Sequence, residues 1–425
     1  MHQNNNRRSI FLIGVLFFVF GFVTWLNGTL ISFLKLVCQL DNDIEAFFVT
    51  FAFYMAYFFL AIPSAQILKR TGFKNGMALG LLVMAIGSIL FVPAANTRNF
   101  SLFLTGLFVQ GMGLALLQTA SNPYISIIGP IESAARRISI MGICNKTAGA
   151  LSPLILGAIA LKNAPALEAK IKQASSAAEK EGLLKELAGR VTLPYIIMAL
   201  ILFLLAILIK KSSLPEINTD GEDADGGIAG SSHATSPKTS VLQFPHLLLG
   251  VLCLFLYVGV EVMAGDAIGI FGRAGGISLD KTRYFTSFTL LAMLAGYIVG
   301  IFTIPRYLSQ QAALRISAIT GILFSACIYF STGFVAITFI ALLGLSNALM
   351  WPAIFPLAIR GLGRFTKMGS ALLIMGICGG ALIPLLYGAL KDKLHLPNGL
   401  SFILCTLPCY LYIYYYSVRG YKADR

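Results

Sequence analysis

Four polar side chains lie inside two segments that are otherwise apolar enough to cross a lipid bilayer. Gln118 and Asn122 belong to the segment LLQTASNPY, and Asn145 and Lys146 belong to IMGICNKTAGALSPLILGA. Polar groups inside a membrane are costly, so they often mark a functional site. Gln118 and Asn122 are four residues apart and therefore share one helix face. We expect all four to line a binding cavity; the alternative is that the amides only hydrogen-bond neighbouring helices together.

Lys146 needs its own explanation, because a lysine at this depth must pair with an acid, lose its charge or reach water. Two acids occur in another apolar segment, YVGVEVMAGDAIG: Glu261 near the middle of the membrane and Asp266 five residues further out. A buried carboxyl can take up and release a proton, and an ionised one can hold sodium. Glu261 and Asp266 are therefore the candidates for coupling to a cation. The alternatives are a structural ion pair with Lys146, a charge at a helix end, and a Lys146 side chain that extends to the membrane surface.

Two further amides, Asn27 and Asn347, are placed near the middle of apolar segments. Asn347 precedes Trp351 by four residues, which puts an amide and a large aromatic ring on one helix face. This arrangement favours a ligand that stacks on the Trp351 ring and hydrogen-bonds the Asn347 amide. A tryptophan that only packs against a neighbouring helix is the alternative for Trp351.

The composition defines the environment of these residues. The chain has 425 residues, of which 57% are hydrophobic and 12% charged, with a mean hydropathy of +0.80. These values indicate an integral membrane protein. The net charge of +14 comes from Lys and Arg scattered between apolar runs, so it is a topology signal and not a nucleic-acid surface. The four histidines lie at or outside the membrane ends and the cysteines have no metal spacing, so we expect neither an enzyme nor a metal site.

The apolar runs are about 20 residues long, the length of a helix that crosses the hydrocarbon core. We therefore predict an all-α membrane protein with twelve transmembrane helices in two sets of six. The predicted helices cover 10–33, 46–67, 76–95, 100–128, 138–161, 192–210, 245–271, 285–304, 314–332, 334–358, 369–389 and 399–417. Lys and Arg are concentrated in the connections on the side of the N-terminus, which predicts that both termini are cytoplasmic.

Two connections are long. Residues 163–190 are rich in Ala, Glu, Lys and Leu, which predicts an interfacial or solvated helix outside the membrane. Residues 212–243 are acidic and rich in Gly and Ser, which predicts a flexible cytoplasmic linker. The linker separates an N-terminal bundle, 1–211, from a C-terminal bundle, 244–425.

An internal repeat relates the two bundles. The pentapeptide IMGIC occurs at Ile140–Cys144 and again at Ile374–Cys378, and the pattern AL-x-PL-x-x-GA follows each copy. The first copy holds about three extra residues, around Asn145, Lys146 and Thr147. Two matched patterns in the fifth and eleventh helices indicate duplication, and parallel repeats of six helices are the organisation of major facilitator transporters.

Several stretches resemble the fucose–galactose–hexose:cation symporters of the major facilitator superfamily. They are GFVTWLNGTLI, FYMAYFFLAIPSAQILKRTGFKNG, ASNPYISIIGP, FLYVGVEV and NALMWPAIFPLAIRGLGRFTKMGSALLIMGICGGALIPLLYG. The resemblance implies two six-helix bundles, a bacterial inner-membrane location, and uptake of a monosaccharide driven by an inward proton or sodium gradient. It implies no other cofactor and no partner beyond the sugar and the lipid bilayer, and we expect a monomer.

The chain departs from the fucose permease pattern at two positions. Gly28 and Gln118 stand where that pattern has acidic residues. We therefore expect a neutral hexose of the glucose or galactose type, with protons favoured over sodium. An N-acetylglucosamine or other sugar porter, and an exporter of small apolar solutes, remain the alternatives.

Overall fold

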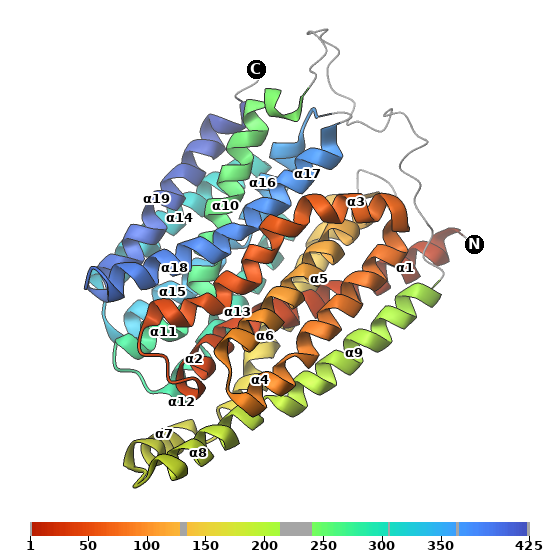
Figure 1. Cartoon of the computed structure of the whole chain (residues 1–425). Coiled ribbons are helices and arrows are strands. Elements are labelled where there is room, and N and C mark those ends of the chain that lie inside the picture. The colour runs from red at the N-terminus through yellow and green to blue at the C-terminus, as the bar shows by residue number, and fades with distance from the viewer. Residues whose placement is uncertain (1, 128–133, 213–239, 305–306, 363–364, 423–425) are drawn as a thin grey trace.

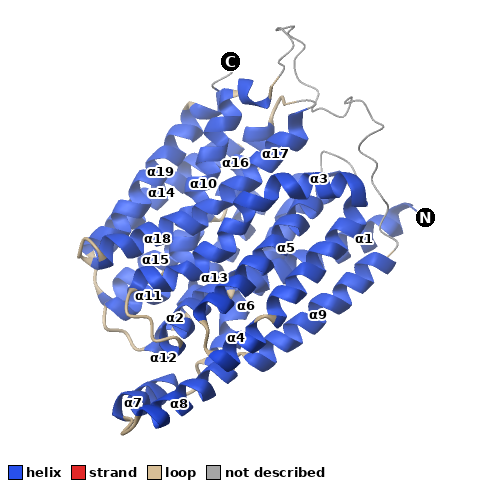
Figure 2. Ribbon diagram, in the orientation of Figure 1, coloured by secondary structure: helices blue, strands red, loops and turns tan. Residues whose placement is uncertain are grey.

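The computed structural model describes residues 2–127, 134–212, 240–304, 307–362 and 365–422. Within these ranges the regular structure is helical, and no strand occurs (Figures 1 and 2). This confirms the predicted all-α class.

Eleven helical stretches in the described part of the chain are long and apolar enough to cross a membrane. One of them, 43–97, contains two crossings, because the chain turns back at Gly72 with a φ of 75°. Only glycine adopts this backbone conformation readily. The structure thus agrees with the twelve predicted transmembrane helices.

The first six crossings use α1 (His2–Trp25) with α2 (Asn27–Val37), the two arms of α3 (Asp43–Ile89) with α4 (Phe91–Thr97), α5 (Phe100–Ile127), α6 (Ala134–Ala160) and α9 (Thr192–Lys211). The last six use α10 (Pro245–Gly265) with α11 (Ile268–Ala274), α13 (Phe285–Thr303), α14 (Gln310–Phe330), α15 (Gly333–Asn347) with α16 (Met350–Ile359), α17 (Thr366–Met375) with η4 (Gly376–Cys378) and α18 (Gly379–Asp392), and α19 (Asn398–Val418). Short helices η2 (Val241–Gln243), α12 (Leu279–Thr282) and η5 (Gly420–Lys422) complete this set.

The connection at 163–190 forms two helices, α7 (Ala164–Gln173) and α8 (Ala177–Gly189), where we had predicted one. The break has a local cause, because the side chain of Ser176 caps α8 by accepting a hydrogen bond from the Glu179 amide. Figure 1 shows this hairpin at the end of the molecule opposite the two termini. We call the hairpin end the outer end and the other the terminal end. Most of the predicted linker at 212–243 lies outside the described residues.

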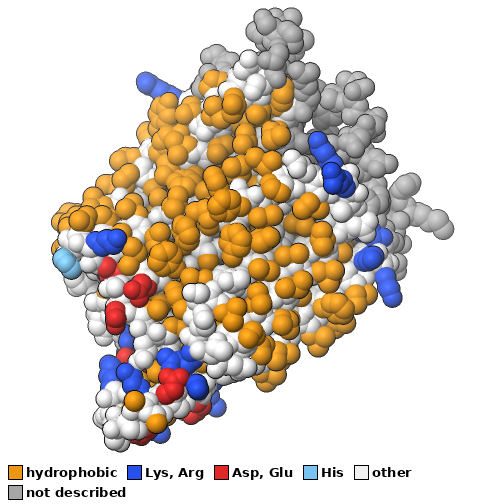
Figure 3. All heavy atoms as spheres, viewed as in Figure 1, with side chains coloured by type: hydrophobic (Ala, Val, Ile, Leu, Met, Phe, Trp, Pro, Cys, Tyr) orange, Lys and Arg blue, Asp and Glu red, His pale blue; other side chains and the backbone are white. Residues whose placement is uncertain are grey.

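The surface matches a membrane environment. Figure 3 shows hydrophobic side chains over the middle of the visible face, while most charged side chains lie towards its ends. On α9, Leu193, Leu200 and Ile201 are exposed. The chain is therefore a multi-pass membrane protein with apolar side chains on its outer faces.

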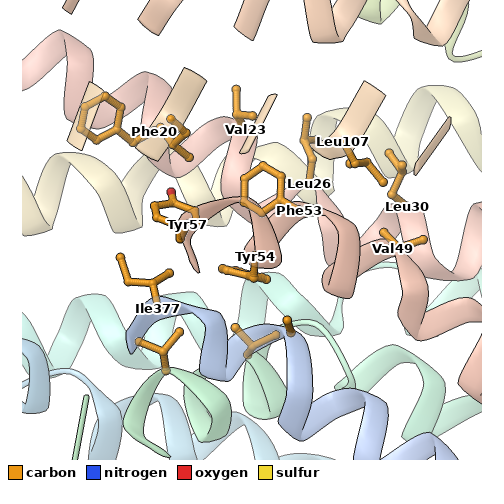
Figure 4. Packing of buried hydrophobic residues seen from close by; sticks show 14 of the residues in the cluster. Phe20, Val23, Leu26, Leu30, Val49, Phe53, Tyr54, Tyr57, Leu107 and Ile377 are labelled. Carbon is orange, nitrogen blue, oxygen red and sulfur yellow. The ribbon is translucent and has the colours of Figure 1, made fainter. Parts of the chain in front are cut away.

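The two bundles meet along two helix pairs, α3 with α18 and α6 with α13. Figure 4 shows Tyr54 and Tyr57 of α3 between Phe20 of α1 and Ile377 of η4. These residues belong to the interior on which both bundles pack. The interface between the bundles thus passes beside the polar segments singled out from the sequence.

Candidate functional site

A cavity of about 130 Å³ lies between the two bundles. Residues of α1, α3, α5 and α6 line it from the first bundle, and residues of α10, α13, α16 and η4 line it from the second. Its size favours a small ligand, because drug-sized ligands use pockets of roughly 300–1,000 Å³.

One wall of this cavity carries amides from the first bundle. Gln118 and Asn122 reach it from α5 and Asn145 reaches it from α6. Gln118 donates a hydrogen bond from Nε2 to the Tyr57 hydroxyl at 3.0 Å, and Asn145 donates from Nδ2 to the Phe17 carbonyl at 3.4 Å. Each of these two amides has a second polar atom, its carbonyl oxygen, that can accept a hydrogen bond from a ligand.

Lys146 pairs with an acid across the bundle interface. Its Nζ donates to Glu261 Oε1 at 2.8 Å, and it lies 4.4 Å from the centroid of the Trp25 ring. Lys146 is only 6% exposed and Glu261 only 8%. Both residues and Trp25 line the cavity. The Lys146 side chain therefore does not extend to the membrane surface. A buried pair of this kind is neutral as a unit, and removal of either partner strands the other charge.

Both bundles contribute aromatic rings to the cavity, and those of the first bundle are Phe17, Phe20, Trp25, Tyr54 and Tyr57. In the second bundle, Trp351 lies 6.5 Å from Tyr257, measured between ring centroids, and Tyr297 of α13 also lines the cavity. Sequence reasoning missed Tyr57, Tyr257 and Tyr297. Tyr257 had a usable signal, because it precedes Glu261 by four residues and so shares its helix face.

Three residues predicted for the site are not among those lining the cavity. Asn347 is buried where α15 ends, accepts a hydrogen bond from the Tyr410 hydroxyl at 2.8 Å and donates from Nδ2 to the Val260 carbonyl at 3.5 Å. Asn27 and Asp266 are buried beside breaks, between α1 and α2 and between α10 and α11. All three are buried, but at these local breaks their side chains are not among those that line the cavity.

Charged contacts join the bundles at the outer end. Asp43 pairs with Lys35 of its own bundle and Lys391 of the other, and Asp392 Oδ2 accepts a hydrogen bond from the Ile44 amide at 2.6 Å. These contacts link the start of α3 to the end of α18. They hold the bundles together on the outer side of the cavity.

A second group of outer contacts uses arginines of the C-terminal bundle. Arg283 donates a hydrogen bond to the Leu161 carbonyl at 2.8 Å, and Arg273 pairs with Glu168 of α7 at 3.1 Å. Cavity-lining residues such as Phe17 and Ile138 lie instead in the terminal half of the first crossing, Ile10–Val37, and in the terminal half of α6. The cavity therefore lies on the terminal side of a closed outer contact.

Comparisons with known proteins agree with this architecture. The family model of the Major Facilitator Superfamily matches residues 12–386. A glucose/galactose transporter of Brucella abortus is 34% identical, covering 99% of this chain and 96% of the relative. An L-fucose-proton symporter of Escherichia coli is 29% identical, covering 90% of this chain and 86% of the relative.

The fold is also similar to solved structures. The crystal structure of the fucose:proton symporter of Escherichia coli has a TM-score of 0.75 and 25% sequence identity, and the match covers 97% of this chain and 98% of that one. A second structure of that transporter, described as being in the outward conformation, matches equally well. The chain belongs to the major facilitator superfamily and, within it, to the fucose–galactose–hexose symporter family.

Proposed function

We propose that this protein imports a neutral hexose of the glucose or galactose type together with protons. The observation that carries the proposal is the make-up of the cavity, which combines three amides of the first bundle, aromatic rings of both bundles and a charge-neutral Lys146–Glu261 pair. Relatives named as glucose/galactose transporters and as L-fucose-proton symporters support the same reading.

The cavity offers a partner for each of the two kinds of surface on a hexose. Its hydroxyls both donate and accept hydrogen bonds, as do the amides of Gln118, Asn122 and Asn145. Its C–H face is apolar and packs well on an aromatic ring such as Trp351 or Tyr257. The charged side chains among the described lining residues, Lys146 and Glu261, neutralise each other, which favours a neutral sugar over an ionic one. An exporter of apolar solutes would not need three amides on one wall.

Transport follows from alternate opening of the two ends around this cavity. The outer end is closed here by the contacts of Asp43, Asp392 and Arg283. If both termini are cytoplasmic, as the distribution of Lys and Arg predicts, this arrangement is the inward-facing side of the cycle. Opening to the outside then requires the outer contacts to separate, and sugar and proton must bind the two arrangements with different affinity.

The proposal is tested with purified protein in proteoliposomes. We expect exchange of labelled glucose or galactose, accumulation when a pH gradient is imposed, and alkalinisation of the outer medium when sugar is added. N-acetylglucosamine and fucose belong in the same panel, because exchange of either in place of glucose and galactose would reassign the substrate. Accumulation driven by a sodium gradient but not by a pH gradient would show that sodium, and not the proton, is the coupling cation. Failure to exchange any monosaccharide would overturn the proposal.

A further inference from the structure

Among the residues that the structure describes, Asp266 differs from Glu261 in having no side-chain partner. Asp266 is 0% exposed, and neither carboxylate oxygen meets the distance and angle of a hydrogen bond with any described residue, although the nearby backbone amide of Gly28 favours the charged form. It occupies the break between α10 and α11. Glu261, five residues earlier, is by contrast paired with Lys146. An ionised carboxylate in the setting of Asp266 is strongly unfavourable, whereas a protonated one is tolerated.

The Asp266 carboxyl lies against Gly28 of the other bundle. A β-carbon added to Gly28 would lie 3.1 Å from Asp266 Oδ1 and 2.3 Å from Thr286 Oγ1. The carboxyl and this hydroxyl therefore use the space that a side chain at position 28 would need. Because Gly28 and Asp266 belong to different bundles, this packing exists only while the bundles are closed around it.

Three titratable groups act on Asp266 from the helices around it. Glu261 of α10 and Lys146 of α6 contribute opposite charges, and Tyr54 of α3 faces the same region. Glu261 and Lys146 largely compensate each other, because they form an ion pair. The Trp25 ring, which lines the cavity, packs on the residue before Asp266, since a β-carbon on Gly265 would lie 2.3 Å from Trp25 Cζ3. The Asp266 carboxyl thus remains without a direct counter-charge.

We propose that Asp266 is the proton-binding group of this transporter, and that closure of the bundles over its carboxyl at Gly28 is what makes transport depend on the proton. This inference rests on the proposed sugar symport. When the outer end opens, water reaches the carboxyl and a proton from the outer medium binds it. The bundles then close over the neutral acid but not over the anion. Displacement of the Trp25 ring from Gly265 then lets water from the cavity reach the carboxyl, and the proton leaves to the terminal side. The anion left behind disfavours the closed packing at Gly28 and so returns the empty transporter to the outward-open arrangement, and one proton crosses with each sugar.

The test separates exchange from accumulation in proteoliposomes. Asp266→Asn mimics the neutral acid, so we expect it to retain sugar exchange but to lose accumulation driven by a pH gradient and to lose sugar-induced alkalinisation. Asp41→Asn is the matched control, because Asp41 is an exposed acid, and it should behave as the unchanged protein. Glu261→Gln should impair exchange itself, because it removes the partner of Lys146 inside the cavity.

The outcomes that would overturn the inference are distinct from failure of the proposed function. Normal pH-driven accumulation by Asp266→Asn would remove Asp266 from coupling, and loss of sodium-driven accumulation alone would assign the site to sodium. Absence of exchange in the unchanged protein would instead refute sugar transport.

A second measurement avoids substitution at Asp266. A membrane-permeant carbodiimide reacts with protonated carboxyls in apolar surroundings, and we expect mass spectrometry to find it on Asp266, with less labelling at alkaline pH. Labelling of Glu261 instead, or of neither acid, would contradict the inference.

Discussion

The two copies of the internal repeat have the same sequence for five residues but different surroundings. Ile140–Cys144 lies within the unbroken helix α6, and the next residues, Asn145 and Lys146, reach the cavity. Ile374–Cys378 instead completes α17 and forms the short helix η4, and the next residues are Gly379 and Gly380. The first copy is thus followed by polar side chains, whereas the second is followed by two glycines, which have no side chain.

The glycines of the second copy permit a close approach of helices. A β-carbon on Gly379 would lie 1.8 Å from the Phe255 carbonyl oxygen, and one on Gly380 would lie 2.9 Å from Val262 Cγ2. Small residues of this kind let helix backbones pack closely in membranes. The two copies therefore differ in role. The first contributes side chains to the cavity, and the second allows α18 to pack closely against α10.

Breaking the ion pair beside the first copy is expected to have the largest effect. Lys146→Met leaves Glu261 charged and buried without its partner, and such changes cost about 3–5 kcal/mol of folding stability. Thermal unfolding in detergent measures the loss. The double variant Lys146→Met/Glu261→Gln should recover much of it, because no charge is then stranded. An unfolding temperature unchanged by Lys146→Met would show that the pair is not needed for the fold.

A methyl group in the second copy should have the next largest effect. Gly379→Ala forces the Phe255 backbone away, and overpacking of this kind costs about 1–3 kcal/mol. Ala148→Gly is the matched control, because Ala148 is the repeat equivalent of Gly379 and already carries a buried β-carbon. That change should cost only about 1 kcal/mol, the usual penalty of glycine in a helix. Equal unfolding temperatures for Gly379→Ala and the unchanged protein would contradict the packing role of the second copy.

Amide removal in the first bundle should affect binding and not folding. Gln118→Ala removes hydrogen bonds worth about 0.5–1.5 kcal/mol each, so sugar affinity should fall about 2- to 12-fold for one bond. Gln110→Ala is the control, because Gln110 lies on the same helix and donates to Ser88 Oγ at 2.8 Å without lining the cavity. We expect Gln110→Ala to lower the unfolding temperature and leave the affinity unchanged. The same Kd for both variants would remove Gln118 from the site.

The smallest effect on stability is expected at the outer hairpin, α7 with α8, which belongs to the first bundle and contacts Arg273 of the second. Burial works to raise the pKa of Glu168, but Arg273 and Lys172 outweigh it and hold that pKa below its usual range. The contact is therefore complete at neutral pH and is lost as the pH falls below about 4, through the lowered pKa. Glu168→Gln should lower the unfolding free energy by at most about 1 kcal/mol at pH 7, since Arg273 is partly exposed. A stability difference that persists in acid would show that Glu168 acts by another route.

Much of the architecture was predictable from the sequence because its causes are local. Apolar runs of the right length must be helical in a bilayer, which has no water to satisfy the backbone. The cost of burying polar groups made five residues recognisable, and the spacing from Asn347 indicated Trp351. The structure places all six around one cavity: Gln118, Asn122, Asn145, Lys146, Glu261 and Trp351. Gly72, which divides α3 into two crossings, also has a local cause in its positive φ.

The remaining assignments depended on tertiary structure. Hydropathy predicted that three polar residues are buried, but it did not predict their surroundings. These residues, Asn27, Asn347 and Asp266, lie at helix breaks, where the neighbouring helices decide the direction of a side chain. The sequence determined that Lys146 needed a counter-charge, but only the packing of α6 against the second bundle selected Glu261 and left Asp266 beside Gly28. The physical reason is that the cost of burial is a property of one residue, whereas pairing depends on the rotation and closeness of two helices that the chain brings together from opposite bundles.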